Sequence, residues 1–368
     1  MTTTDSSGRR RWAALLLAVI TPLVAELTLG NPPLSQIWLM LLWVPIYGAG
    51  TVLIRELVRR RGAGWLSILL LGIAYGIVEE GLALQALSSP TLYGVAGWAP
   101  RILGLNSAYT ELNLPYHAVF SVALPILLVD LVFPGLRERP YLKRTGLVVT
   151  GVVFVLGAAL LRLSVTGFID PGYQAPLPVV AGCLAAVALL AVLALRVVPR
   201  ASQLASSTSQ TVPHSSRTAS HSSAPAAGTG AVPGSWAVAA FGGLVAFGYL
   251  ALLFPFGGAT QPAFTRGNWV AVPMLAAAAL AVVAWWLIRR WTTSGAWTDR
   301  HSLALTGGAL VAHTAFGVLA NAATLTERAE LTALGLVMIG LLALLGRRSP
   351  APAAQPAETA HRPRTSGP

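Results

Sequence analysis

The sequence predicts an all-α fold, a polytopic transmembrane helix bundle of about ten spans, and three observations support this class. Of the 368 residues, 55% are hydrophobic and 10% are charged, whereas about a quarter of the residues of a soluble domain are charged. Apolar runs long enough to cross a bilayer as helices recur along the chain. Short clusters of arginine lie between many of these runs, as topology signals do in membrane proteins.

The basic residues predict how the spans are oriented. With a cytoplasmic N-terminus, only Arg101, Arg266 and Arg328 lie in outer loops. Arg162 lies within the fifth span, so the other 21 of the 25 Lys and Arg residues lie on the inner side. This bias predicts that both termini are cytoplasmic, and we attribute the net charge of +12 to topology and not to a nucleic-acid partner. The expected spans are residues 12–30, 36–55, 64–87, 114–134, 145–164, 176–198, 235–256, 268–289, 302–324 and 331–346.

A polar segment divides the predicted bundle. Residues 199–234 are rich in Ser, Ala, Thr and Pro and have almost no aromatic or branched apolar residues, so they cannot form a core. We expect a disordered cytoplasmic linker there, between a six-span bundle (residues 1–198) and a four-span bundle (residues 235–348). Residues 349–368 are expected to be a disordered cytoplasmic tail. The excess of arginine over lysine, with abundant alanine and glycine, is typical of a GC-rich bacterial genome, so we expect the protein in a bacterial plasma membrane.

The third span carries the sharpest functional signal, because two adjacent glutamates, Glu79 and Glu80, lie in an apolar run. A charged side chain at the centre of a membrane helix costs about 2.5 to 3.5 kcal/mol on insertion scales, so these carboxyls must be protonated, paired or in contact with water. Helical spacing places Gly72, Gly76 and Glu80 on one stripe, which favours close approach of another helix. Tyr75 and Glu79 form the neighbouring stripe, so both carboxyls face the bundle and would share a proton.

Other ionisable side chains are predicted to lie near the glutamates, in the outer half of the membrane. Glu26, His117 and His313 lie on the first, fourth and ninth spans. Glu26 could instead lie in the headgroup region and His117 could form a hydrogen bond at the interface, whereas a polar role is favoured for His313. Arg162 is expected to form a salt bridge with a glutamate, with snorkelling of its side chain toward the outer surface as the alternative. Asn321 follows His313 on the ninth span and adds a further polar group.

Charged residues at helix ends and prolines within spans are predicted to have structural roles. Asp130, Arg55 and Glu56 lie at inner helix ends, where solvated or paired surface roles are expected. Prolines near the centres of three early spans predict kinks or openings of the helices. These prolines are Pro22, Pro45 and Pro125.

The outer loop of residues 88–113 contains Tyr93, Trp98 and Tyr109, whose rings suit the membrane interface. We expect an interfacial loop, with a lid over the site as the alternative. At the end of this loop, Asn113 as a cap and Pro115 in the first turn predict the start of the fourth span.

These residues leave several functions open. The carboxyls and histidines could relay protons coupled to the movement of a small solute, hold a divalent metal ion, or activate water to hydrolyse a membrane-embedded substrate. An accessory subunit, in which polar groups only join helices, is a further alternative. We favour proton-coupled transport, with the lipid bilayer and a solute as partners; enzyme activity and oligomeric state stay open. The assigned residues are Glu79, Glu80, His117 and His313 for proton relay or general base, and Glu26, Tyr75, Gln85, Arg162 and Asn321 for substrate contacts.

The absence of several catalytic motifs argues against some classes of enzyme. The sequence contains no HExxH zinc motif, no GxSxG elbow, no GxxxxGK[ST] phosphate loop and no paired CxxC. ATP hydrolysis within this chain is therefore not expected. Cys183 is the single cysteine, so an internal disulfide is excluded.

The order of the polar residues resembles that of the CAAX-processing and bacteriocin-processing intramembrane endopeptidase family. In that family a double glutamate is followed by a histidine and later by a second histidine with an asparagine. The resemblance implies that Glu79 or Glu80 activates water and that His117 and His313 are its partners. Three motif positions differ here: Leu84 replaces an arginine, no phenylalanine precedes His117 by four residues, and Asn321 follows His313 by eight residues and not four.

Overall fold

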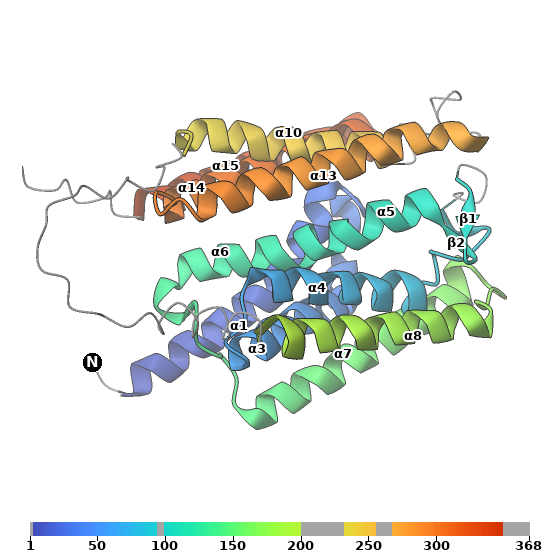
Figure 1. Cartoon of the computed structure of the whole chain (residues 1–368), viewed down its shortest axis with the longest axis horizontal. Helices are drawn as coiled ribbons and strands as arrows, with labels where there is room; N and C mark the ends of the chain where they lie inside the picture. The colour runs from blue at the N-terminus through green and yellow to red at the C-terminus, as the bar shows by residue number, and fades with distance from the viewer. Residues whose placement is uncertain (1–2, 94–98, 200–231, 255–266, 349–368) are drawn as a thin grey trace, which may run out of the picture.

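Figure 1 shows a computed structural model, which describes residues 3–93, 99–199, 232–254 and 267–348. Ten helical stretches in these residues are long and apolar enough to cross a membrane. This confirms the predicted fold class and number of spans. The only strands in the described residues are two short ones, β1 (Arg101–Ile102) and β2 (Leu105–Asn106), which pair as a hairpin. The expected linker and tail lie outside the described residues, apart from residues 199 and 232–234.

The first six spans combine α-helices with short 3-10 or π-helical segments, whereas the last four are mostly continuous α-helices. The α-helices of the first group are α1 (Thr3–Ala25), α2 (Met40–Trp43), α3 (Ala49–Arg60), α4 (Trp65–Gly76), α5 (Ser107–Tyr116), α6 (Leu124–Val132), α7 (Arg144–Ser164) and α8 (Leu177–Val192). Its short segments are η1 (Leu27–Leu29), η2 (Leu34–Leu39), η3 (Val44–Gly48), η4 (Ile77–Ala83), η6 (His117–Ala123), η7 (Pro134–Leu136), η8 (Val165–Ile169) and η9 (Leu193–Val197). The second group consists of α10 (Ser235–Leu253), η10 (Gly267–Val270), α13 (Ala271–Thr292), α14 (Asp299–Ala320) and α15 (Leu325–Arg348).

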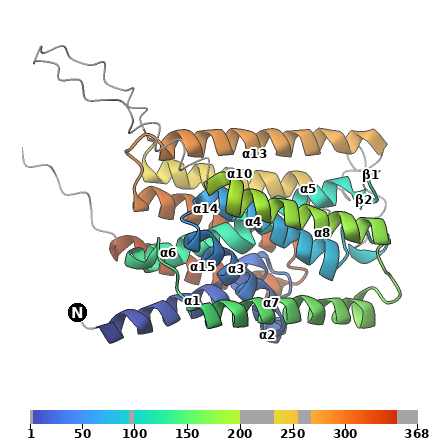
Figure 2. The same ribbon diagram turned by 60° about the horizontal axis from the view of Figure 1, so that its bottom comes forward.

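The two groups of spans lie side by side and share a hydrophobic core. In Figure 1 the yellow-to-red helices α10, α13, α14 and α15 lie above the blue-to-green helices, and Figure 2 shows the bundle after a turn, with α13 at the top. α10 and α14 face the first group, where they contact α5, α6 and η1. The shared core includes Val24, Leu112, Phe120, Leu250, Leu310 and Phe316.

The spans differ in how far they are buried. The spans that contain α4 and α5 are mostly buried inside the bundle, whereas α7, α8, α13 and α15 expose most of their apolar side chains. Exposed apolar helices at the periphery suit contact with lipid, because acyl chains are as apolar as these side chains. The most buried spans are therefore the ones that carry the adjacent glutamates and His117.

Regular helix is interrupted near each of the three central prolines. Pro22 lies in the last turn of α1, which is followed by η1, and Pro45 lies within π-helical η3. Pro125 lies in the first turn of α6, which follows π-helical η6 directly. Proline lacks an N–H and crowds the preceding turn, so it favours such changes. The predicted helix breaks are confirmed.

The fourth span begins earlier than predicted. The Asn106 side chain, and not Asn113, caps the helix by accepting a hydrogen bond from Tyr109 N–H at 2.9 Å. Pro115 lies inside α5, near its end. The expected start was wrong because Asn106 already satisfies a free N–H group of the first turn, which is the function of an N-cap.

The small-residue stripe of the third span packs against the fourth, as predicted. A Cβ atom at Gly72 would lie 2.6 Å from Ala118 Cα, and one at Gly76 would lie 3.2 Å from His117 Cβ. The absence of side chains at these two glycines therefore brings α4 close to η6.

Replacing Gly72 with valine is expected to destabilise the fold by about 1–3 kcal/mol, the usual effect of overpacking. The added carbons would collide with the Ala118 main chain, which cannot move aside as a flexible side chain can. Gly182→Val on α8 is the matched control, because a Cβ there meets nothing within 4 Å. Thermal unfolding of the two purified variants in detergent measures the difference, and equal midpoints would contradict the close packing.

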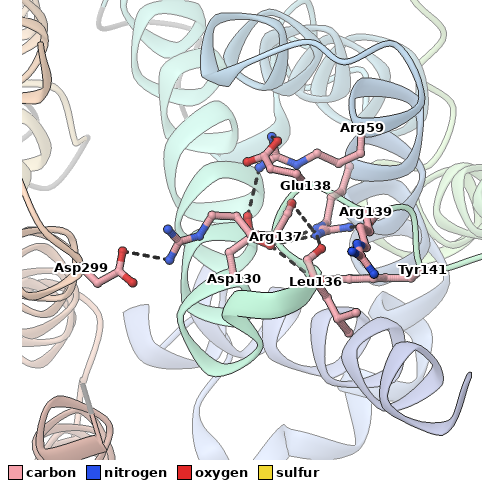
Figure 3. A network of polar contacts seen from close by, with 9 residues as sticks. Arg59, Asp130, Leu136, Arg137, Glu138, Arg139, Tyr141 and Asp299 are labelled. Atoms are coloured by element: carbon pink, nitrogen blue, oxygen red, sulfur yellow. Dashed lines mark hydrogen bonds and ion pairs between the residues drawn. The ribbon is translucent and has the colours of Figure 1, made fainter. Parts of the chain in front are cut away.

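A buried ion-pair network lies where α3 meets α6, and most of it is labelled in Figure 3. Asp130 accepts hydrogen bonds from Arg55 and Arg59, both at 3.0 Å, and all three side chains are almost completely buried. Arg59 also pairs with the exposed Glu138 at 3.1 Å. The Arg55 guanidinium lies over the Tyr141 ring, 3.5 Å from its centre. Burial raises the pKa of Tyr141, so its hydroxyl stays protonated and can donate to Asp130.

The same network holds the connection between α6 and α7. Arg55 donates to the main-chain carbonyls of Leu136, Arg137 and Arg139, and the buried Glu56 carboxylate accepts main-chain N–H groups of that connection. The expected solvated roles of these inner helix ends were wrong, although the expected pairing is present. Sequence spacing does not reveal the burial, because the partners lie more than 70 residues apart.

Candidate functional site

Glu79 and Glu80 lie in π-helical η4, which ends the third span. Their side chains are buried, with residues 2% and 4% exposed. The span ends at Ala83 and not at Leu87 as predicted, because Gln85 adopts a left-handed φ of 59° that a helix cannot continue through. The two carboxyls therefore lie at the end of a helix and inside the protein.

His117 connects the two glutamates. Its Nε2 lies 3.1 Å from Glu80 Oε1, and its Nδ1 lies 3.4 Å from Glu79 Oε2. Nδ1 also lies 2.9 Å from the hydroxyl of Ser121, one turn further along the same segment. The prediction that His117 lies beside the glutamates is confirmed. An imidazole between two carboxyls can take a proton from one and deliver it to the other.

Glu26 joins this group through a tyrosine. The Tyr47 hydroxyl donates to Glu26 Oε1 at 2.5 Å, and its ring centre lies 6.2 Å from that of His117. On the other side, the Tyr109 hydroxyl donates to Glu80 Oε2 at 3.1 Å. We refer to Glu26, Glu79, Glu80 and His117 as the Glu–His cluster.

Not every polar atom at the Glu–His cluster is satisfied. Glu79 Oε2 and the Tyr75 hydroxyl are buried and make no hydrogen bond of good geometry within the described residues, although Glu79 Oε2 lies 3.4 Å from His117 Nδ1. The Tyr75 ring packs edge-on against His117, with centres 5.7 Å apart. Because buried polar groups are usually hydrogen-bonded, orphaned atoms of this kind often mark sites of exchange or binding.

Three π-helical segments meet at the cluster: η3 supplies Tyr47, η4 supplies Glu79 and Glu80, and η6 supplies His117. π-helical turns are rare, and they occur frequently at functional sites. Three of the five π-helical segments in the described residues therefore supply side chains to this region, whereas η8 and η9 supply none.

His313 lies in a neighbouring group, and within the described residues its polar contacts are with hydroxyl groups and not with a glutamate. Its Nε2 lies 2.9 Å from the Tyr116 hydroxyl and its Nδ1 lies 3.2 Å from Thr28 Oγ1. The ring stacks on Phe120, with centres 4.4 Å apart. Tyr116 also donates to the Ala25 carbonyl, so His313 is connected to the chain next to Glu26 through hydroxyl groups and main chain.

Three other predicted site residues bind main-chain groups. Arg162 donates to the carbonyls of Ala83, Leu84 and Tyr173, so the expected salt bridge with a glutamate was wrong. Carbonyls at the end of a helix have no intrahelical partner, and an arginine satisfies them well. Gln85 accepts the Ala175 N–H at 2.7 Å, and Asn321 donates to the Leu29 carbonyl at 2.8 Å.

The outer loop lies partly over the cluster. Tyr109 is only 6% exposed, so its expected place at the membrane interface was wrong, whereas Tyr93 is 54% exposed and stacks on it. Leu87 and Leu92 pack in the same buried group as Tyr109. Trp98 lies outside the described residues.

Sequence reasoning missed the hydroxyl partners of the cluster. Ser121 follows His117 by four residues, a helical spacing that could have revealed it. Four polar residues spaced by four also form one face of the second span, and the sequence analysis did not use this signal. They are Tyr47, Thr51, Arg55 and Arg59.

Among the residues that the structure describes, no group of three His, Cys, Asp or Glu side chains could hold a metal ion. Within the cluster, Glu80 and His117 share a hydrogen bond, Glu26 and Glu80 each accept one from a tyrosine, and Glu79 lies 3.4 Å from His117.

Comparison with known proteins adds a family and no activity. No curated protein and no solved structure matches the chain significantly. One family model matches residues 15–361, which include all ten spans except the first residues of the first one. The chain therefore belongs to an uncharacterized membrane protein family.

Proposed function

We propose that this protein is a proton-coupled transporter of a small solute and that the Glu–His cluster is its proton-binding site. The observation that carries the proposal is the contact of His117 with both Glu79 and Glu80 inside the bundle. Ionisable groups within membrane spans are costly, and chains of Asp, Glu and His are typical of proton relays in transporters.

Charge balance supports protons as ligands of the cluster. Three carboxyls face one imidazole, and no lysine or arginine of the described residues forms an ion pair with Glu26, Glu79 or Glu80. With every group ionised, the cluster would hold a net charge of −2 in a buried place, which is costly. Protons bound by carboxyls remove that charge.

Polar side chains extend from the cluster in two directions, through Tyr109 and Tyr93 on one side and through Ser121 and Thr51 on the other; we call this row the polar seam. On one side the Glu80 carboxylate accepts from Tyr109, which stacks on the exposed Tyr93. On the other side His117 contacts Ser121, whose carbonyl accepts from Thr51 at 2.8 Å. Transport requires such a path to both faces, whereas an accessory subunit does not.

The far side of this seam ends in the ion-pair network. Arg55 follows Thr51 by one helical turn on α3, and Arg59 follows by another. Arg59 then pairs with Glu138, whose side chain is 73% exposed. Alternating access would require the stacked tyrosines and the ion-pair network to open in turn. With the positive-inside orientation, the network lies at the cytoplasmic end.

Solute-driven proton flux tests the proposal. Protein is reconstituted into liposomes loaded with the pH dye pyranine, and amines, amino acids and sugars are added outside one at a time. We expect at least one solute to change the internal pH, and Glu80→Gln to abolish this change while the variant stays folded. The control is Glu111→Gln, a carboxyl of α5 outside the cluster, which should retain the flux. Protein-dependent flux of equal size in Glu80→Gln would contradict the assignment.

Hydrolysis within the membrane is the second candidate, and one observation favours it. A glutamate paired with a histidine can activate water, and Glu80 lies 3.1 Å from His117. The resemblance to the intramembrane endopeptidases would add His313 as a second partner. In the structure, His313 instead contacts Thr28 and Tyr116.

A further inference from the structure

A second feature lies on the side of the helix bundle, at the exposed surface of α7 and outside the Glu–His cluster. An open groove with a volume of about 500 Å³ runs along α7 beside α3. This volume is within the range of about 300–1,000 Å³ that is usual for small-ligand sites. The groove is lined by Leu53, Val148, Gly151, Val152, Phe154, Val155 and Leu156.

The lining of the groove determines what could fill it. All of its side chains are apolar, so a polar solute would find no partner there for its hydrogen-bonding groups. α7 is among the least buried spans, and Val148, Val152 and Leu156 are exposed. In a membrane, an apolar groove on such a helix faces lipid, so hydrocarbon is the matching occupant.

The end of the groove is basic. Lys143 directly precedes α7 and Arg144 is its first residue; both are exposed and form no ion pair within the described residues. Val148 of the groove follows Arg144 by four residues, so the two lie on the same face of the helix. Arg60 is also close, because it donates to the Leu142 carbonyl at 2.6 Å, but its charge is paired with Glu56 at 3.1 Å.

We infer that an anionic glycerophospholipid binds at this place, with an acyl chain in the groove and its phosphate beside Lys143 and Arg144. Anionic headgroups are attracted to basic residues at a membrane surface. The headgroup then gives selectivity, since a zwitterionic lipid offers the same chains with a balanced charge. The Phe154 ring, which lines the groove, also packs on Tyr75 with centres 6.1 Å apart. The Phe154 side chain would thus lie between the lipid and Tyr75, whose ring packs against His117.

Native mass spectrometry of the full-length protein tests this site. Delipidated protein in detergent is titrated with dioleoyl phosphatidylglycerol and, separately, with dioleoyl phosphatidylcholine. We expect one phosphatidylglycerol to be retained more tightly than phosphatidylcholine. The double variant Lys143→Gln/Arg144→Gln should bind phosphatidylglycerol about tenfold more weakly and leave phosphatidylcholine unchanged. Gly151→Trp should weaken both lipids by filling the groove, and it should fold normally because a Cβ there meets nothing within 4 Å.

Two matched controls separate this site from general lipid contact. Arg289→Gln/Arg290→Gln removes two exposed charges from the end of α13, and Gly182→Trp adds the same ring to an open position on α8. Both controls should bind phosphatidylglycerol like the unmodified protein. The inference is overturned if the two lipids bind equally, or if the controls weaken binding as much as the variants at the groove.

Discussion

Replacing Asp130 with alanine is expected to destabilise the folded protein by about 3–5 kcal/mol, the range for breaking a buried ion pair. The Asp130 carboxylate is fully buried and accepts hydrogen bonds from Arg55 and Arg59. Its removal leaves the fully buried Arg55 guanidinium without a counter-charge. Arg55 also donates to three carbonyls of the connection between α6 and α7, so that connection should loosen as well.

The midpoint of thermal unfolding in detergent measures this effect, and the chain offers a matched control. Asp299 pairs with Arg137 at 2.9 Å, but its side chain is 45% exposed, and Figure 3 shows this pair at the edge of the network. An exposed pair contributes about 0–1 kcal/mol, so Asp299→Ala should have little effect. If both variants unfold at the same temperature, the Asp130 network is not a main support of the fold.

The ion-pair network also limits how the proposed transporter could open. The polar seam passes Arg55 and Arg59, so access to the cluster from that end requires the contacts of Asp130 to separate or shift. The opposite end is closed by the stacked rings of Tyr93 and Tyr109, a weaker contact of about 0.5–1.5 kcal/mol beyond burial. We therefore expect the tyrosine end to open more readily.

The sequence was sufficient for the fold because the relevant signals are local. Hydropathy gave all ten spans, and proline chemistry gave the breaks near Pro22, Pro45 and Pro125. The stripe of Gly72 and Gly76 predicted a close helix contact, since helical spacing fixes which residues share a face. Each of these inferences needs only neighbours within a few turns.

Side-chain partners could not be predicted in the same way, because they depend on where distant helices pack. Arg162 binds carbonyls that become free only because Gln85 ends η4, 77 residues earlier in the chain. Tyr109 was expected at an interface, and the fold of the outer loop instead turns it onto Glu80. The sequence predicted that His117 and His313 both lie near the glutamates. The structure places only His117 in contact with them, and His313 lies in a separate group.

That separation leads to the second large effect, a different response of the two buried histidines to substitution. His117→Gln removes the side chain that joins Glu79 to Glu80, so solute-driven proton flux should be lost. His313→Gln should retain the flux, because His313 contacts hydroxyl groups and the Phe120 ring and no carboxyl. It should still lower stability by about 1–3 kcal/mol, the usual effect of leaving a buried polar partner unsatisfied.

The pyranine assay and thermal unfolding, applied to both variants, separate the two roles. A general loss of folding would lower the unfolding midpoint of His117→Gln together with its flux, so a folded His117→Gln protein without flux is the decisive result. Hydrolysis of the kind implied by the endopeptidase resemblance needs both histidines. If His313→Gln stays folded and loses the flux as His117→Gln does, His313 belongs to the functional site, and the division between the Glu–His cluster and the His313 group is wrong.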